Sequence, residues 1–365
     1  SALNQMDIFC ITGNGADVEV QRQAAVPNSD LVIACTSTDE MNMLSCLIAR
    51  KLGAKHTIVR LRSPLYYRQI DLLREELHFS MAVNPESAAA NEVAKILLFP
   101  EANKVETFMK GRVELVEFPV EAGTSIADLS LAEIYRKFQI KILVCAVKRG
   151  NEVHIPDGDF VLMAGDKLHI AAAHQDLKSF FKSLGRRSTR IKNVMICGGG
   201  YLAFYLTSQL LQAGMQVKII EKNKERCETL CELLPKVTVI HGDATDQELL
   251  LEEGIREADA FVAITGMDEE NIIMSLFAKT QNVDKVIAKV NEDSRAQMVE
   301  ALGIDITVSA KSAAADAISS YVKARMNSYS SANIETMYRL VNGRIEAQEY
   351  IIKKECEFVG IPLKD

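Results

Sequence analysis

Short apolar runs alternate with helix-like stretches over much of the chain. Residues 194–197 are apolar and lead into three consecutive glycines, after which leucines recur at helical spacing up to Leu211. A second apolar run begins at Val217 and stops at Glu221. A strand, a glycine turn, a helix and a second strand in this order predict a βαβ unit, the building block of a doubly wound parallel sheet.

The glycine turn fits a dinucleotide-binding fingerprint. Gly198, Gly200 and Ala203 match G-x-G-x-x-G/A, in which glycines permit a tight turn and close backbone approach, and a small third residue lets helix and strand pack. Backbone N–H groups at the helix start, at Tyr201 and Leu202, would then face a pyrophosphate. We therefore expect nucleotide binding here, the alternative being a tight turn in an ordinary doubly wound sheet.

An acidic residue stands where the fingerprint requires one. Glu221 ends the second apolar run about 20 residues after the glycines, where a carboxylate can accept both ribose hydroxyls and repel a 2′-phosphate. Lys222 follows in the same loop. This arrangement favours NAD or an adenine nucleotide over NADP.

An internal repeat is the most informative feature of the sequence. The segment from Gly13 aligns without a gap to the segment from Gly242, at a constant offset of 229 residues. The matched pairs include Asp17 with Asp246, Thr36 with Thr265, Asp39 with Asp268, and Asn42 with Asn271. Self-similarity of this length indicates duplication of a structural module.

The repeat also predicts the domain organisation. The same offset places the glycine turn of the first copy before residue 1, so we interpret the first copy as N-terminally truncated. Segments such as "RVELVEFPV", "KILVCAVKRG" and "FVLMAGDKLHIAA" alternate partially with period 2, and "SIADLSLAEIYRKF" between them predicts a helix, so a small β-rich module follows. The expected divisions are a first dinucleotide-type domain at 1–104, a β-rich domain at 105–185, a linker at 186–190, a complete dinucleotide-type domain at 191–330 and the start of a second β-rich domain at 331–365.

Two interpretations apply to the acid in "VIHGDATD". An apolar strand precedes Gly242, so Asp243 and Ala244 fall at the carboxyl edge of the sheet, where open parallel sheets bind ligands. Asp243 can accept the adenine amino group there. It can equally serve as the N-cap of a helix that starts near Gln247.

Two further strand ends carry polar candidates. Thr265 and Gly266 end the strand in "AFVAITGMDEEN" and are candidates for ligand contact. Asp268 and Asn271 lie three residues apart on one helical face, where they either order this loop or meet a neighbouring subunit. Lys289 ends a fifth strand, where a cation can pair with a phosphate or simply be solvated.

Composition limits the function classes. Of 365 residues, 48% are hydrophobic and 25% charged, as in an ordinary soluble protein of two or three domains, and no apolar run reaches the roughly 18 residues of a membrane span. A net charge of −7 argues against a nucleic-acid partner, because phosphate attraction requires a clustered positive surface.

Cysteines and histidines give no strong metal signal. The eight cysteines are scattered, mostly in apolar runs and without a C-x-x-C pair, which is typical of reduced residues in a cytoplasmic protein. His154 and His169 lie on separate predicted strands, with His174 beyond the last one. A small-ligand or metal site from these three is one interpretation, but separately satisfied histidines are the simpler one, and we expect no metal.

The combined motifs resemble a known family. A dinucleotide-type domain with "GGGYLA", "EKN", "GDAT" and "DEEN", followed by a small β-rich domain and present in duplicate, is similar over essentially the whole chain to TrkA, the cytoplasmic regulatory subunit of bacterial Trk potassium-uptake systems. The resemblance implies duplicated Rossmann-like sheets (RCK_N, or KTN), each followed by a small α+β RCK_C (TrkA-C) domain. It also implies a homo-oligomer, a dimer or tetrameric ring, on the inner face of the cell membrane. There it would gate potassium flux through TrkH or TrkG in response to NAD(H) or ATP/ADP.

Carried onto this sequence, the family's nucleotide positions and their loop neighbours give a candidate set. The set comprises Gly198, Gly199, Gly200, Tyr201, Leu202, Glu221, Lys222, Asp243, Ala244, Thr265, Gly266 and Lys289. The first copy departs from the pattern, since Asn14 in "GNGA" replaces the acid of "GDAT".

Two other functions are open: an NAD-dependent oxidoreductase, and a ligand-binding regulator of another ion transporter. A dehydrogenase requires an acid or base near the nicotinamide, and His241, next to Gly242, is the best candidate for one. However, a β-rich module and a second dinucleotide-type domain stand where a substrate domain would be. We therefore expect the protein not to be an enzyme.

Overall fold

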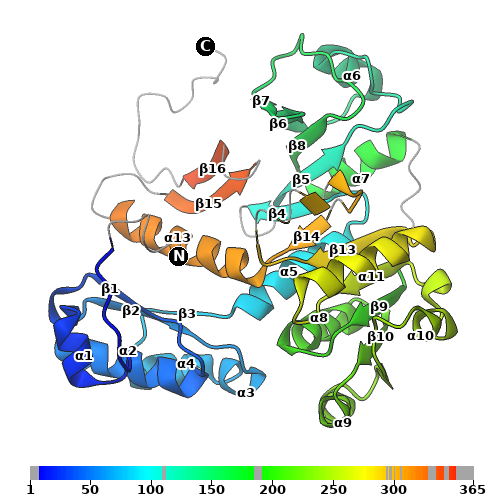
Figure 1. Ribbon diagram of the computed structural model, residues 1–365. Coiled ribbons are helices and arrows are strands. Elements are labelled where there is room, and N and C mark those ends of the chain that lie inside the picture. The colour runs from blue at the N-terminus through cyan, green and yellow to red at the C-terminus, as the bar shows by residue number, and fades with distance from the viewer. Residues whose placement is uncertain are drawn as a thin grey trace, which may run out of the picture. The chain divides into compact units, whose positions relative to one another are not determined.

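The computed structural model describes residues 8–108, 112–184, 191–292, 295, 298–299, 301–304, 306–327, 334–340 and 345–350. The chain divides into two units (Figure 1). One comprises Ser1–Ala88 with Ala313–Ile318, and the other Ala89–Ser312 with Ser319–Asp365.

The larger unit contains a parallel sheet of six strands in the order β11-β10-β9-β12-β13-β14. The strands are β9 (Asn193–Cys197), β10 (Gln216–Glu221), β11 (Thr238–His241), β12 (Ala260–Ala263), β13 (Lys285–Lys289) and β14 (Ile306–Val308). The chain proceeds outward from β9 to β11 on one side and from β12 to β14 on the other. The strand order therefore reverses between β9 and β12, the switch point at which such sheets bind ligands.

Helices cover both faces of this sheet. Because successive residues of a strand point to opposite faces, Met195 and Ile196 of β9 belong to different buried clusters. The cluster around Ile196 includes residues of α8 (Tyr201–Gln212) and α9 (Lys224–Leu233). The cluster around Met195 includes residues of α10 (Gln247–Glu252) and α11 (Asp268–Thr280). The predicted doubly wound fold is confirmed.

A helix from earlier in the sequence completes the first of these clusters. Helix α5 (Pro85–Leu98) contributes Ala89, Val93, Ile96 and Leu97 to the core that contains Ile196. The predicted first dinucleotide-type domain, 1–104, included these residues. Their apolar side chains are buried in the core of the larger unit instead.

The smaller unit repeats the element order of the second sheet. Its parallel strands are β1 (Leu31–Ala34), β2 (His56–Arg60) and β3 (Met81–Val83), and its helices are α1 (Val18–Gln23), α2 (Asp39–Leu52), α3 (Pro64–Tyr67) and α4 (Ile70–Leu77). Strands β1 and β2 pair Ala34 with Val59, and β12 and β13 pair Ala263 with Ala288, so both partners are shifted by the offset of 229. Duplication therefore extends to the strand register.

The β-rich domain is a five-stranded antiparallel sheet in the order β4-β5-β8-β6-β7. Its strands are β4 (Lys104–Phe108), β5 (Val113–Pro119), β6 (Leu143–Arg149), β7 (Glu152–His154) and β8 (Lys167–Ala172). Side chains of α6 (Leu131–Phe138) and α7 (His174–Ser183) join one buried cluster with one face of this sheet. The predicted α+β character is confirmed.

The structure defines three local features of this domain more closely than the sequence does. The helix starts at Leu131 because Ser130 and Glu133 form a capping box there. The turn sequence "AGDKL" within the run 160–172 does form a turn, because Gly165 adopts a φ of +91° and turns the chain before β8. Helix α7, whose buried face carries Leu177, Phe180 and Phe181, was not predicted.

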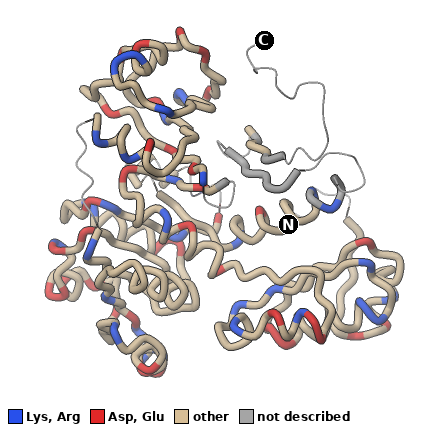
Figure 2. Tube along the Cα trace, turned by 180° about the vertical axis from the view of Figure 1, so that it is seen from behind, with Lys and Arg blue, Asp and Glu red and all other residues tan. Residues whose placement is uncertain are grey.

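The remaining elements are α13 (Ala310–Asn327) and an antiparallel hairpin of β15 (Ile334–Leu340) and β16 (Ile345–Tyr350). The predicted linker at 186–190 lies outside the described residues. Among the residues that are described, none of the helices has the length and apolar character needed to cross a membrane. Lysine and arginine are interspersed with aspartate and glutamate along the described chain (Figure 2).

Candidate functional site: the carboxyl edge of the second parallel sheet

The predicted nucleotide positions come from loops at one edge of the six-stranded sheet. Parallel strands have their carboxyl ends at a common edge, so residues that follow different strands meet there. In chain order these are Gly198–Gly200 after β9, Glu221 at the end of β10, Asp243 after β11, Thr265 after β12 and Lys289 at the end of β13. The sheet topology thus brings together residues that lie far apart in the sequence.

The first glycine of the turn is required by the fold itself. Gly198 has a φ of +103°, and a Cβ there would lie 3.0 Å from backbone atoms of Thr265. Its N–H donates to the carbonyl oxygen of Ile220 over 2.9 Å, which ties the turn to β10. A side chain at this position would need both a strained backbone and displacement of the neighbouring strand end.

The second and third glycines differ in what surrounds them. A Cβ on buried Gly199 would lie 2.6 Å from the Cδ1 of Leu230 and 3.0 Å from an oxygen of Glu221. Exposed Gly200, the N-cap of α8, has a φ of −66°, and a Cβ there would meet no atom within 4 Å. Neither the backbone angle nor the packing of the described protein requires glycine at position 200.

The carboxylate of Glu221 is held in place by main-chain donors. Oε2 accepts from the N–H of Gly199 over 2.6 Å, and Oε1 accepts from the N–H of Asn223 over 2.7 Å. A carboxylate oxygen can accept more than one hydrogen bond, so both oxygens retain capacity for a ligand hydroxyl. The group predicted to bind ribose is therefore fixed in orientation by its own turn.

Arg226 also contacts the turn, and sequence reasoning missed it. Its Nε donates to the carbonyl oxygen of Gly199 over 2.6 Å, and its guanidinium carbon lies 5.5 Å from the centre of the Tyr201 ring. Asn223, the N-cap of α9, accepts the backbone N–H of Arg226 over 2.9 Å. A signal was present in the sequence, since a capping asparagine directly after the acid places Arg226 in the first helical turn.

Asp243 is not the N-cap of the following helix; Asp246 caps α10, accepting from the N–H of Glu248. Asp243 instead closes a short turn, in which Oδ1 accepts from the N–H of Thr245 over 3.0 Å and from its hydroxyl over 2.7 Å. These hydrogen bonds, led by the backbone donor, lower the pKa of Asp243 from its ordinary value. The carboxylate is exposed at the sheet edge.

Thr265 and Lys289 are linked through a buried asparagine. The side-chain oxygen of Asn271 accepts from the N–H of Thr265 over 2.8 Å, and its Nδ2 donates to the carbonyl oxygen of Lys289 over 3.0 Å. Asp268 accepts from the N–H and Nδ2 of Asn291 over 2.8 and 2.9 Å. Of the two roles expected for Asp268 and Asn271, the structure shows the ordering of the strand-end loops.

The other predicted residues have mixed exposure. Leu202 and Ala244 are buried and pack in the two cores of the sheet. Tyr201 is half-buried, whereas Lys222 and Gly266 are exposed. For Leu202 and Ala244, contact with a ligand is therefore restricted to backbone atoms.

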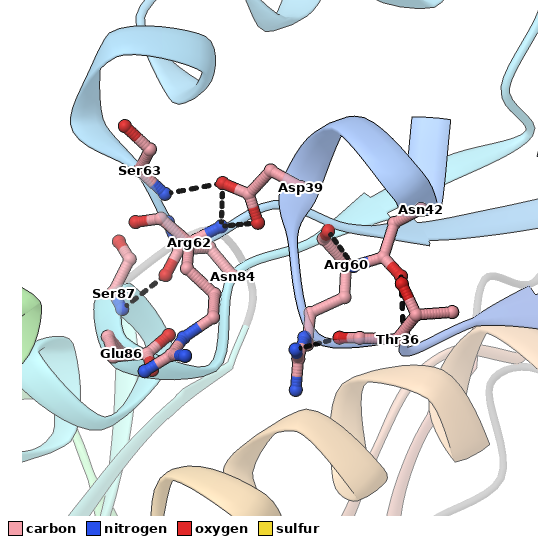
Figure 3. A network of polar contacts seen from close by, with 9 residues as sticks. All are labelled: Thr36, Asp39, Asn42, Arg60, Arg62, Ser63, Asn84, Glu86 and Ser87. Carbon is pink, nitrogen blue, oxygen red and sulfur yellow. Dashed lines mark hydrogen bonds and ion pairs between the residues drawn. The ribbon is translucent and has the colours of Figure 1, made fainter. Parts of the chain in front are cut away.

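The first copy forms an equivalent network at its own sheet edge (Figure 3). The side-chain oxygen of Asn42 accepts from the hydroxyl of Thr36 over 2.7 Å, and its Nδ2 donates to the carbonyl oxygen of Arg60 over 2.9 Å. Asp39 accepts from the N–H groups of Arg62 and Ser63 over 2.9 and 2.8 Å. These contacts match those of Asn271 and Asp268.

Two arginines give the first copy a different charge. Arg60 donates through its guanidinium to the carbonyl oxygen of Thr36. Arg62 pairs with Glu86, with Nε 2.6 Å from Oε1 (Figure 3). The corresponding positions in the second copy are Lys289 and Asn291.

The histidines do not converge on one site. His154 lies 3.5 Å from Glu152, and His174 lies 2.9 Å from Glu114. His169 is buried, and burial lowers its pKa from the ordinary value. Within the described ranges, histidine, cysteine and acidic side chains form no group of three that could hold a metal ion.

Comparisons with known proteins agree with this architecture. The TrkA-N domain profile matches residues 1–85 and 194–310, and the TrkA-C domain profile matches residues 115–185. The "Trk system potassium uptake protein TrkA homolog" of Archaeoglobus fulgidus is 33% identical over 364 residues, which cover 100% of this chain and 80% of that protein. The "Trk system potassium uptake protein TrkA" of Halomonas elongata is 32% identical over 95% of this chain and 75% of that protein.

Solved structures share the fold. The GsuK RCK domain superposes with a TM-score of 0.66 at 19% identity, covering 90% of this chain and 70% of that one. A GsuK channel bound to NAD also gives a TM-score of 0.66, at 18% identity, covering 93% and 60% of the two chains. The duplicated parallel sheets and the β-rich domain thus share the fold of an RCK domain. The chain belongs to the TrkA family of Trk-system potassium uptake proteins.

Proposed function

We propose that the protein is a nucleotide-sensing regulatory subunit that binds NAD(H) or ATP/ADP at the carboxyl edge of its second sheet. The proposal rests on one observation, that a fixed carboxylate at Glu221 lies at the same sheet edge as an open position at Gly200. The carboxylate of Glu221 is fixed by two N–H donors, and a Cβ on Gly200 would meet no atom of the described protein within 4 Å. A fixed hydrogen-bond acceptor beside an open helix start suits a ribose followed by a phosphate.

The proposed output is regulation of a membrane potassium transporter of the TrkH or TrkG type. Membership of the TrkA family supports this partner, as does the name of the Halomonas relative. We propose a cytoplasmic homo-oligomer, a dimer or tetrameric ring, that is held at the membrane by its partner and is not an enzyme. Regulation requires that a nucleotide bind two conformations with different affinity, because equal affinity shifts no equilibrium.

A substitution at Gly200 tests the site, because the fold does not require glycine at this position. We expect Gly200→Asp to weaken NAD and ADP binding at least about tenfold, because the new carboxylate enters the predicted phosphate position. Calorimetric titration of the protein with NAD, ATP and ADP measures this. Gly158→Ala is the matched control, since its Cβ would lie at an ordinary 3.8 Å from Ala132 in the β-rich domain.

Undiminished binding by Gly200→Asp would remove this edge from the proposal. The regulatory output is tested separately, by potassium flux through a reconstituted Trk transporter with and without the protein and nucleotide. An oxidoreductase would instead reduce NAD when candidate alcohols or hydroxy acids are supplied. Hydride transfer in that assay would contradict the non-enzymatic proposal.

A further inference from the structure

Arg226 holds the peptide group between Gly199 and Gly200. Its Nε donates to the carbonyl oxygen of Gly199 over 2.6 Å. The described chain contains no cis peptide bond, so the N–H of Gly200 points away from that carbonyl in the same plane. We propose that Arg226 is a positioning residue that aims the Gly200 N–H at a bound phosphate, an inference that rests on the nucleotide site proposed above.

The orientation that Arg226 gives this peptide forms no hydrogen bond from the Gly200 N–H to any described residue. Gly200 is exposed, and a Cβ there would meet no atom within 4 Å. Among the described residues, the structure gives the N–H of Gly200 no acceptor. A donor held in a fixed direction at the start of α8 is the arrangement that an anionic ligand group requires.

The turn is fixed on both sides of Gly199. Its N–H is bound by Glu221 over 2.6 Å, and its carbonyl by Arg226. Arg226 is in turn anchored by its backbone N–H, which donates to the capping Asn223, and its guanidinium carbon lies 5.5 Å from the centre of the Tyr201 ring. Because a Gly-Gly peptide has little steric preference of its own, these contacts set its orientation before a ligand arrives.

Three variants separate a positioning role from a direct charge effect. Arg226→Met removes the N–H donor and the charge. Arg226→Gln keeps an amide N–H at the same distance from the backbone as the arginine Nε but removes the charge. Lys224→Met removes a charge from an exposed residue in the same helical turn. Each variant is titrated calorimetrically with ADP, NAD and adenosine, and its thermal unfolding is measured alongside.

Arg226→Met is expected to weaken ADP and NAD binding about tenfold, the effect of one lost hydrogen bond to a charged group, and to change adenosine binding by less than about twofold. Arg226→Gln should stay within about threefold of the unsubstituted protein for all three ligands, and Lys224→Met should match that protein. Hydrogen exchange without ligand should show faster exchange at residues 199–201 in Arg226→Met than in Arg226→Gln.

Several outcomes would overturn the inference. Equal ADP affinity of Arg226→Met and the unsubstituted protein excludes the role. An equal loss in Arg226→Gln assigns the effect to charge rather than to peptide orientation. An equal loss of adenosine affinity in Arg226→Met indicates general damage to the site. If the unsubstituted protein binds neither ADP nor NAD, the proposed function fails first, and the inference fails with it.

Discussion

The two dinucleotide-type copies share a buried polar frame. In each copy an asparagine, Asn42 or Asn271, binds a threonine just beyond one strand and the last carbonyl of the next strand. In each copy an aspartate, Asp39 or Asp268, accepts an N–H two residues beyond that carbonyl. Both copies use these side chains to join two strand ends to a helix start.

The copies differ in the charges that the frame supports. Arg60 and Arg62 of the first copy stand where the second copy has Lys289 and Asn291. The frame binds the main chain of these positions, so their side chains can change while the loops keep their course. Asparagine and aspartate of the frame cannot change as freely, because their partners are buried or partly buried backbone groups.

The largest expected effect is loss of the frame asparagine. Asn42→Leu and Asn271→Leu should each lower the free energy of unfolding by about 2–4 kcal/mol, because backbone donors and acceptors are left unpaired. Urea denaturation measures this, and hydrogen exchange assigns it to one copy. The exposed Lys51→Leu and Lys279→Leu on the same helices should stay within about 0.5 kcal/mol. A large loss in one copy alone would break the comparison.

Within the described residues the glycine turn belongs to the second copy. Substitutions at Gly198 and at Gly200 should change the free energy of unfolding by different amounts. Gly198→Ala should cost about 2–4 kcal/mol, because a φ of +103° and backbone atoms 3.0 Å away both oppose a Cβ. Gly200→Ala should change the free energy of unfolding by less than about 0.5 kcal/mol. Thermal and urea unfolding of the two variants provide the measurement. Equal losses would mean that position 200 also serves the fold.

Helix caps offer a smaller, matched comparison. Asp17 caps α1 and Asp246 caps α10, each accepting a hydrogen bond two residues on, from Glu19 and Glu248 respectively. Asp17→Ala and Asp246→Ala should each destabilise by about 1 kcal/mol. Urea denaturation followed by circular dichroism checks the size, and local hydrogen exchange checks the place. Losses of unfolding free energy that differ by more than twofold would show that the two copies do not stabilise these helices equally.

The smallest effect is expected at the turn after β11. Asn14 accepts from the N–H of Ala16 as Asp243 accepts from that of Thr245, both over 3.0 Å, so an amide can make this turn. Asp243→Asn should therefore change stability at neutral pH by less than about 0.5 kcal/mol. Hydrogen bonding lowers the folded pKa of Asp243, so its stabilisation is present at neutral pH and lost as pH falls through that pKa.

The free energy of unfolding, measured against pH for the parent protein and the Asp243→Asn variant, tests the predicted direction of this pH dependence. The parent should lose more stability than the variant as the solution is acidified. A contribution of Asp243 to adenine binding would appear separately, as weaker binding of adenosine by the variant. Unchanged adenosine affinity would restrict Asp243 to its turn.

The sequence predicted much of the fold because periodicity and duplication can be read from the linear order of residues. The strands, helices and glycine fingerprint follow from short-range patterns, and the duplication follows from comparing two segments of the chain. The position of Asp268 and Asn271 on one helical face was also predictable from their spacing in the sequence. Their main-chain partners were not, because Thr265, Lys289 and Asn291 meet them only when neighbouring strands align.

Other features could be established only from the folded structure. The sequence left Asp243 as either a ligand contact or an N-cap, and the structure shows that Asp246 caps α10 instead. The apolar residues of α5 reveal that they are buried but not in which core, and the structure places them in the core of the larger unit.

By itself the sequence determined the doubly wound architecture, the duplication and the location of a nucleotide fingerprint, because each is a pattern in the linear order of residues. The tertiary structure decided which side chains fix that fingerprint. Glu221 accepts from the N–H of Gly199 and Arg226 donates to its carbonyl oxygen, and this depends on how β10 and α9 pack against the turn. Hydrogen bonds of this kind depend on atomic positions that only the folded chain sets.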